Sequence, residues 1–318
     1  MPEEITAKDA VHESHDSASF WRKIFVGRGG IRAGWRLAIF LVIAVGSIWL
    51  VHRGVKRIPG VARIFHQGFL SPSLEYFLEI PMAICLLVCC LVMARIEKRS
   101  LGDYGLSLRR EAGGHLLWGL VWGLCVFSGV IALIAVLHGF SFGGLALQGS
   151  ALLKYASLWA IGFLLVGFVE EFMFRGYVQF TLADGIGFWP AAVVWSVAFG
   201  ALHLRNPSEN LVGAFEVFLF AIFACLTLHR TGALWFAIGF HAAGDYAETF
   251  LFSVPDSGFR ASGALLHSTL HGPPWLTGGK VGPEGSVFSM LALCVAMVCF
   301  HFLYPRTKRY GVISHTTP

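Results

Sequence analysis

The chain has 318 residues, of which 56% are apolar and 14% are charged, and its mean hydropathy is positive. A soluble domain of this length does not need so much apolar surface, so the composition excludes an ordinary water-soluble enzyme and indicates a protein embedded in lipid. The net charge of +5 does not indicate a nucleic-acid partner, because the basic residues stand at the ends of apolar runs rather than on one soluble face.

The first twenty residues are polar and acidic, without the basic start and apolar stretch of a signal peptide. We therefore expect residues 1–20 to form a disordered tail, residues 21–310 to form a single transmembrane domain, and residues 311–318 to form a C-terminal tail.

Apolar runs of about 20 residues, the length that a helix needs to cross about 30 Å of hydrocarbon, recur along the domain. The predicted spanning helices cover residues 35–51, 74–94, 113–138, 153–182, 188–205, 211–229, 231–250 and 286–304. The predicted fold class is an all-α, polytopic membrane helix bundle of about eight transmembrane helices. The distribution of Lys and Arg between the helices favours both termini in the cytoplasm, although the basic first outer loop argues against this orientation.

Three of the predicted helices carry ionisable side chains, which cost about 3 kcal/mol each at mid-depth in a membrane. These side chains are Glu170, Glu171 and Arg175 in the fourth helix, His203 in the fifth, and His241 and Asp245 in the seventh. The fourth and fifth helices are predicted to form an antiparallel hairpin that turns through residues 184–187. Glu170 and His203 each lie about 22 Å from that turn at 1.5 Å per residue, and His241 lies about 15 Å into its own helix, so we expect the groups to meet.

Spacing within the helices suggests how these groups are paired. Glu171 and Arg175 are four residues apart and can form an ion pair on one helix face, which leaves Glu170 free. His241 and Asp245 have the same spacing, and Glu248 continues their stripe. Glu75 and Glu79, at the start of the second helix, are predicted to face lipid headgroups, with a substrate groove as the alternative.

This cluster has the chemistry of a hydrolase. Glu170 could act as a general base that takes a proton from water, with His203 positioning the water, while His241 and Asp245 stabilise an oxyanion or bind a metal. Two histidines and two carboxylates could hold a divalent ion such as zinc, with Glu170, His203, His241 and Asp245 as ligands. No H-E-x-x-H helix is present, so a metal-free glutamate mechanism is the alternative.

The motifs E-E-x-x-x-R, F-x-x-x-H and H-x-x-x-D occur in this order, ending at Arg175, His203 and Asp245. With the flanking segments FRGYVQ, HLRNP and TGALWFAIGFH, they resemble the CPBP family of CAAX proteases and bacteriocin-processing enzymes, also called the Abi family. The similar core covers about residues 113–250.

The resemblance implies an intramembrane endopeptidase with Glu170, His203, His241 and Asp245 as catalytic residues and Glu171 and Arg175 in support. Eukaryotic members usually have Asn where this chain has Asp245, and an ionised Asp cannot donate a hydrogen bond, so orienting His241 or binding a metal fits Asp245 better.

The segments GWRLAIF and TGALW are more similar to bacterial members, which predicts the bacterial inner (cell) membrane as the location. The expected substrate is a hydrophobic or lipidated peptide or protein, reached through membrane lipid. Two alternatives from other classes use the same polar cluster: a non-catalytic membrane immunity or interaction protein, and a proton-coupled transporter.

Overall fold

The computed structural model describes residues 24–27, 30–58, 69–108 and 111–305. The predicted tails at 1–20 and 311–318 lie outside the described residues, as do both ends of the predicted 21–310 domain.

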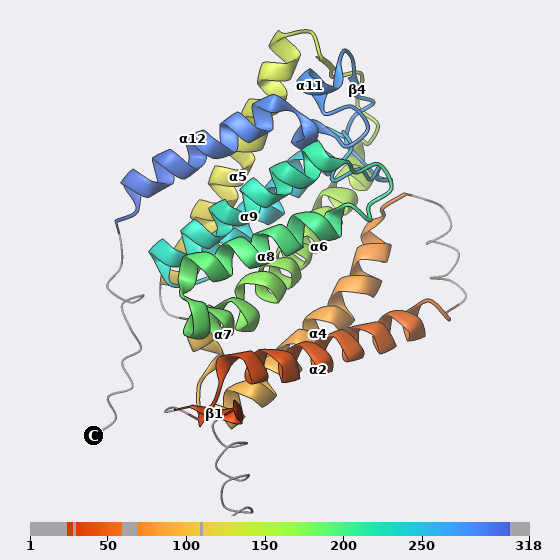
Figure 1. The fold of residues 1–318 in the computed structure, drawn as a ribbon. Coiled ribbons are helices and arrows are strands. Elements are labelled where there is room, and N and C mark those ends of the chain that lie inside the picture. The colour runs from red at the N-terminus through yellow and green to blue at the C-terminus, as the bar shows by residue number, and fades with distance from the viewer. Residues whose placement is uncertain (1–23, 28–29, 59–68, 109–110, 306–318) are drawn as a thin grey trace, which may run out of the picture.

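Helices dominate the described chain, and the predicted all-α membrane bundle is confirmed (Figure 1). The helices are α2 (Ala33–Val55), α4 (Pro72–Ile96), α5 (Glu111–Val136), α6 (Gly149–Arg175), α7 (Tyr177–Ile186), α8 (Phe188–His203), α9 (Leu211–Thr231), α10 (Trp235–Asp245), α11 (Pro274–Thr277) and α12 (Val287–Leu303), with the 3₁₀ turns η1 (Leu101–Tyr104) and η3 (Pro283–Gly285) and the π-helix η2 (Tyr246–Leu251). Two short antiparallel pairs join β1 (Val26–Gly27) to β2 (Gly30–Ile31) and β3 (Phe140–Ser141) to β4 (Thr269–Leu270).

Five helical segments in the described residues are long and apolar enough to cross a membrane: Ala33–Val55, Pro72–Ile96, Ala112–Val136, Gly149–Ile186 and Leu211–Thr231. The other three predicted spans correspond to α8, α10 and α12, which have 16, 11 and 17 residues. A straight helix of that length is shorter than the hydrocarbon core. These short helices pack within the bundle beside the longer ones.

Two predicted helix boundaries are wrong. The helix predicted over 153–182 breaks at Gly176, where a Cβ atom would lie 2.3 Å from the carbonyl oxygen of Phe172, so that only glycine fits the turn from α6 into α7. The helix predicted over 231–250 begins later, at Trp235, because Gly232 adopts φ 71° and ends α9. Its last turn, η2, is π-helical, a form that occurs frequently at functional sites.

Close contact between α5 and α10 sets the position of α10. A Cβ atom at Gly119 would lie 2.2 Å from the Phe236 carbonyl oxygen, and one at Gly123 would lie 2.3 Å from the Phe240 carbonyl oxygen. Gly239 on α10 makes the reciprocal approach to α5. Small residues four apart let membrane helices approach backbone to backbone. The position of α10, the helix that carries His241, is therefore fixed by a close crossing with α5 that leaves no room for a side chain at these glycines.

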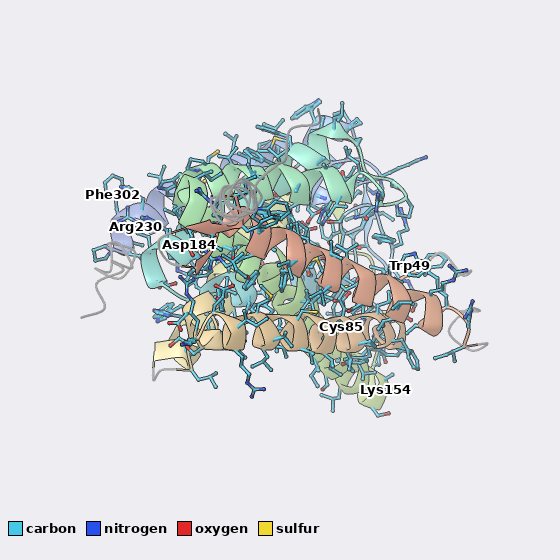
Figure 2. All side chains as sticks on the ribbon, turned by 60° about the horizontal axis from the view of Figure 1, so that its bottom comes forward. Trp49, Cys85, Lys154, Asp184, Arg230 and Phe302 are labelled. Carbon is cyan, nitrogen blue, oxygen red and sulfur yellow. The ribbon has the colours of Figure 1, made fainter. Side chains whose placement is uncertain are left out.

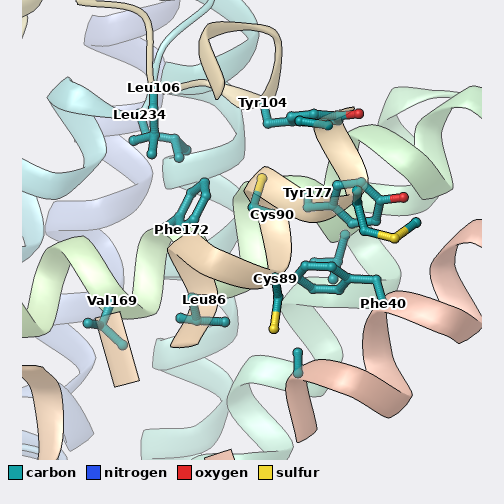
Figure 3. Close-up of a cluster of buried hydrophobic side chains, with 14 of the residues drawn as sticks. Phe40, Leu86, Cys89, Cys90, Tyr104, Leu106, Val169, Phe172, Tyr177 and Leu234 are labelled. Carbon is teal, nitrogen blue, oxygen red and sulfur yellow. The ribbon is translucent and has the colours of Figure 1, made fainter. Parts of the chain in front are cut away.

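A buried apolar cluster joins α2, α4, α6 and α7 (Figure 3). Phe40 of α2 stacks on Tyr177 of α7 with ring centroids 4.4 Å apart, and Cys90 and Phe172 bring in α4 and α6. The outer surface is also apolar: Trp49 and Phe302, both labelled at the periphery in Figure 2, are exposed. Apolar side chains on both the inside and the outside are expected when lipid surrounds the bundle.

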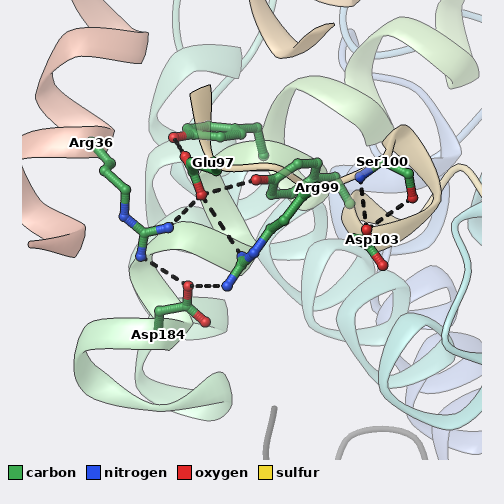
Figure 4. Close-up of polar contacts among 8 residues, drawn as sticks. Arg36, Glu97, Arg99, Ser100, Asp103 and Asp184 are labelled. Carbon is green, nitrogen blue, oxygen red and sulfur yellow. Dashed lines mark hydrogen bonds and ion pairs between the residues drawn. The ribbon is translucent and has the colours of Figure 1, made fainter. Parts of the chain in front are cut away.

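At the end of the bundle that holds β1 and α7, a charged network replaces the apolar core (Figure 4). Arg36 of α2 pairs with Glu97 and, at 2.9 Å, with Asp184. Arg99 lies 3.2 Å from the same Asp184 oxygen, and the hydroxyl of Tyr104 donates to Glu97 at 3.0 Å. The network ties α2, the end of α4 and α7 together.

Candidate active site

The last turns of α6 carry the E-E-x-x-x-R motif. Glu171 and Arg175 are fully buried, and the predicted pair is present, with Arg175 Nη1 3.4 Å from Glu171 Oε1. The Arg175 guanidinium also lies over the ring of Phe199 from α8, 4.3 Å from its centroid. This cation–π contact, between desolvated groups, fixes the first motif against the second.

His241 of α10 is the centre of the cluster. Its Nδ1 lies 2.9 Å from Glu171 Oε1, while its Nε2 lies 3.7 Å from Glu170 Oε2 and 3.6 Å from Asp245 Oδ2. An ionised carboxylate can only accept, so Nδ1–H donates to Glu171 and the ring is oriented with Nε2 toward the other two carboxylates. A buried carboxylate thus fixes which ring nitrogen faces Glu170 and Asp245.

Exposure separates the two adjacent glutamates. The Glu171 side chain is completely buried, whereas 28% of the Glu170 side chain is exposed, more than that of His241 or Asp245. Glu170 is therefore the carboxylate that water or a substrate can reach, and Glu171 is an internal support.

His203 at the end of α8 is connected to this cluster through Phe199. Its Nδ1 lies 2.9 Å from the Phe199 carbonyl oxygen, which must accept, so Nδ1 carries a proton. The Phe199 ring contacts His203 with centroids 4.5 Å apart and lies 6.4 Å from the His241 ring. Within the part of the chain that the structure describes, no hydrogen bond or ion pair links His203 directly to Glu170. The three motifs thus meet, with Phe199 between the two histidines.

A family model described as type II CAAX prenyl endopeptidase Rce1-like matches residues 152–247. Residues 152–247 are therefore similar to this family. The match confirms the resemblance to the CAAX-protease family and supports a CAAX-type membrane endopeptidase. It includes every predicted site residue, from Glu170 to Asp245, and covers most of the predicted core at 113–250. None of the curated proteins compared with the chain matches it.

Three acidic residues outside the motifs lie near Glu170. Glu75 and Glu79 of α4 are 7% exposed, so the prediction that they face headgroups is wrong; both lie close enough to Glu170 for their charges to interact. Asp256, in the loop after η2, was not predicted. Burial raises its pKa to about 6, and it is close enough to His241 for their charges to interact.

Glu248, predicted to continue the stripe of His241 and Asp245, lies in the π-helical turn η2, close enough to Asp245 for their charges to interact. Its carboxylate also lies within 4.8 Å of those of Asp256 and Glu284.

Proposed function

We propose that the chain is an intramembrane endopeptidase in which Glu170 activates a water molecule for attack on a peptide bond. The observation that carries the proposal is the asymmetric setting of His241, held through Nδ1 by buried Glu171 while Nε2 faces the accessible Glu170. Glu170 takes a proton as the water oxygen bonds to the carbonyl carbon. That proton then passes to the amide nitrogen, the C–N bond breaks, and a carboxylate and an amine leave.

The two histidines take different parts in this reaction. Because Nδ1–H of His203 donates to a backbone carbonyl, Nε2 of the neutral ring can accept a hydrogen bond from the attacking water. His241, with its second proton on Nε2, would donate to the oxyanion of the tetrahedral intermediate. Asp245, 3.6 Å away, would hold that nitrogen in place. Glu171 and Arg175 act through His241 and Phe199, as positioning residues.

A divalent ion such as zinc is the second form of this proposal. Glu170, His203, His241 and Asp245 would be its ligands, and the ion would supply Lewis-acid activation of water or of the carbonyl oxygen. His241 could offer only Nε2, because Glu171 occupies Nδ1. Separations of 3.6 and 3.7 Å bring Asp245 and Glu170 near that nitrogen, but no three of these four residues have ligand atoms within 4.8 Å of one another in the described structure, so binding one ion would require them to draw together. The metal-free form of the proposal does not require these residues to bind an ion.

The proposed substrate is a hydrophobic or lipidated peptide or protein that reaches the site from surrounding lipid. The outer faces of the helices carry exposed apolar residues such as Val42 and Val298, so the substrate and the enzyme would both lie in membrane lipid. We further propose the bacterial cell membrane as the location, with both termini in the cytoplasm. The bias of Lys and Arg between the helices supports this orientation.

The test compares the purified full chain with Glu170→Gln and His203→Ala in nanodiscs, using a library of hydrophobic peptides analysed by mass spectrometry, with and without a chelator. Asp103→Asn is the matched control, because it removes a carboxylate of the η1 capping box, outside the site, and the amide oxygen of Asn can still accept the hydrogen bonds that Ser100 donates. We expect wild type and the control to cleave, and Glu170→Gln to lose at least about 10³-fold in kcat.

The outcomes separate the candidate functions. Cleavage that survives chelation supports the metal-free form. If the chelator abolishes cleavage and added zinc restores it, the metal form is supported. Equal inertness of folded wild type and Glu170→Gln would favour the immunity or interaction protein. Proton-coupled flux of a solute, lost in Glu170→Gln without any cleavage, would favour the transporter.

A further inference from the structure

Three carboxylates form a second cluster beyond the proposed active site. Glu248 comes from the π-helical turn η2, Asp256 from the loop that follows it, and Glu284 from η3, just before α12. Each offers a carboxylate oxygen, and these three oxygens all lie within 4.8 Å of one another. Glu248 is 1% exposed and Asp256 is 8% exposed. None of the four proposed catalytic residues belongs to this trio.

Glu248 is the member whose setting points to a ligand. Both of its carboxylate oxygens are buried and lack a hydrogen-bond partner among the described residues. A buried carboxylate is normally hydrogen-bonded, paired with a cation or bound to a metal. The charged groups that interact with Glu248 are themselves acidic: Glu284, Asp256, Glu216 and Asp245. The cluster therefore gathers acidic side chains around a carboxylate whose two oxygens have no partner in the described part of the chain.

The other two carboxylates are held in place by neighbouring hydroxyl and amide groups. Thr249 Oγ1 donates to Asp256 Oδ2 at 2.7 Å. The backbone N and the hydroxyl of Ser257 both donate to Glu284 Oε2, at 2.9 and 2.7 Å. In each case one oxygen is fixed and the other oxygen of the same carboxylate is left for a further partner. Such outer contacts orient the ligands in metal sites.

The surrounding backbone brings these three segments together. The Val254 amide donates to the Glu248 carbonyl at 2.9 Å, and the Gly258 amide donates to the Val281 carbonyl at 2.8 Å. Gly282 adopts φ 112°, and a Cβ atom there would lie 2.0 Å from the Pro255 carbonyl oxygen. Only glycine allows the segment before Glu284 to approach the segment that carries Asp256 so closely.

We propose that Glu248, Asp256 and Glu284 bind one hard divalent cation of the size of Ca²⁺. Carboxylate oxygens are the ligands that Ca²⁺ and Mg²⁺ prefer, whereas structural zinc favours nitrogen and sulfur. Oxygens bound to Ca²⁺ lie about 2.3–2.6 Å from the ion, so two of them can be up to about 5 Å apart. The limit of about 4.2 Å for Mg²⁺ would require the cluster to contract. Water would complete the coordination shell.

A cation at this position would join the end of η2, the loop after it and the start of α12. Loop residues 252–286 would then be fixed to the helix that carries His241 and Asp245. Glu216 of α9 adds a fourth buried carboxyl group nearby, which accepts from the Ser289 hydroxyl at 2.6 Å. The ion would brace this end of the bundle and take no part in the chemistry at Glu170.

The experiment uses the full chain in nanodiscs, stripped with a chelator and dialysed, and titrates it with CaCl₂ by calorimetry. Thermal unfolding is followed in parallel with and without 1 mM CaCl₂. We expect one saturable site, a higher Tm with Ca²⁺, and at least a tenfold weaker affinity in Glu248→Gln and Glu284→Gln. Asp103→Asn, which removes a carboxylate of the η1 capping box outside both clusters, is the control and should keep the wild-type affinity within twofold, whether or not the chain proves to be a protease.

The sign of the stability change makes the test decisive. Without a bound ion, Glu248→Gln replaces a buried carboxyl group that has no partner among the described residues and should raise Tm, and with Ca²⁺ the wild type should gain more than the variant. Absence of saturable Ca²⁺ binding to the folded wild type, or equal binding by Glu248→Gln, would overturn the proposal. If Glu248→Gln does not fold, Glu284→Gln is judged by the same two criteria.

Discussion

Glu171 and His241 share a 2.9 Å hydrogen bond that joins α6 to α10 inside the bundle. The accepting oxygen is the one that also lies 3.4 Å from Arg175, so a single carboxylate oxygen serves a cation on its own helix and an imidazole on another. Both Glu171 and Arg175 are completely buried. Removing either partner would leave the other as an uncompensated charge in a low-dielectric interior.

Glu171→Gln and Arg175→Met should each destabilise the protein by roughly 3–5 kcal/mol, since each leaves a buried charge without its counterion. The double variant should lose less than the sum, with an interaction energy of about 1–3 kcal/mol, because the two charges disappear together. Denaturant unfolding of the four proteins in one detergent measures this cycle. Additive losses would show that the pair is not coupled and that His241 alone holds Glu171.

Gly119→Ala should displace α10 and with it His241. The added methyl group would meet the Phe236 carbonyl oxygen at 2.2 Å, a backbone atom that can move only if the two helices separate. We expect a loss of about 1–3 kcal/mol in unfolding free energy. The fractional loss of cleavage activity should be larger than the fractional loss of stability. The matched control is Gly129→Ala on the same helix, where nothing lies within 4 Å, and it should be neutral or slightly stabilising.

The sequence predicts contacts that depend on local spacing. The ion pair between Glu171 and Arg175 follows from four residues of separation on a helix, and the structure contains it. Apolar length likewise predicts where most of the helices lie. Matching depth also predicted that His241 would approach Glu170, which it does at 3.7 Å.

Features that depend on the approach of distant segments were not predictable. Gly119 looks like any other glycine in an apolar run until α10 crosses it, and Gly176 breaks a helix whose hydropathy continues unchanged on both sides. Asp256 lies in a loop and Glu284 in the short turn η3, neither of which has a periodicity that would bring it to Glu248. The bond between Glu171 and His241 links residues 70 positions apart, which spacing alone cannot pair.

Glu97→Gln should destabilise the protein more than Asp184→Asn. Both residues belong to the charged network at the end of the bundle that holds β1 and α7. The Glu97 side chain is 7% exposed and serves Arg36, Tyr104 and Tyr177, whereas the Asp184 side chain is 28% exposed. We expect a loss of about 3 kcal/mol for the first change and less than about 1 kcal/mol for the second. Denaturant unfolding gives both values, and raised salt should weaken only the contribution of Asp184. The reverse order would mean that Asp184 carries the network.

Phe199→Leu should lower both stability and kcat. Leucine keeps most of the apolar volume but loses the cation–π contact with Arg175, which is worth about 2 kcal/mol between desolvated groups, and the ring contact that holds His203. A misplaced His203 affects the chemical step, so kcat should fall by roughly tenfold or more while KM changes little. Phe215→Leu is the control, since that ring is 52% exposed on α9 and should tolerate the change. A higher KM with an unchanged kcat would instead mean that Phe199 contacts the substrate. The position of His203 would then not depend on the Phe199 ring.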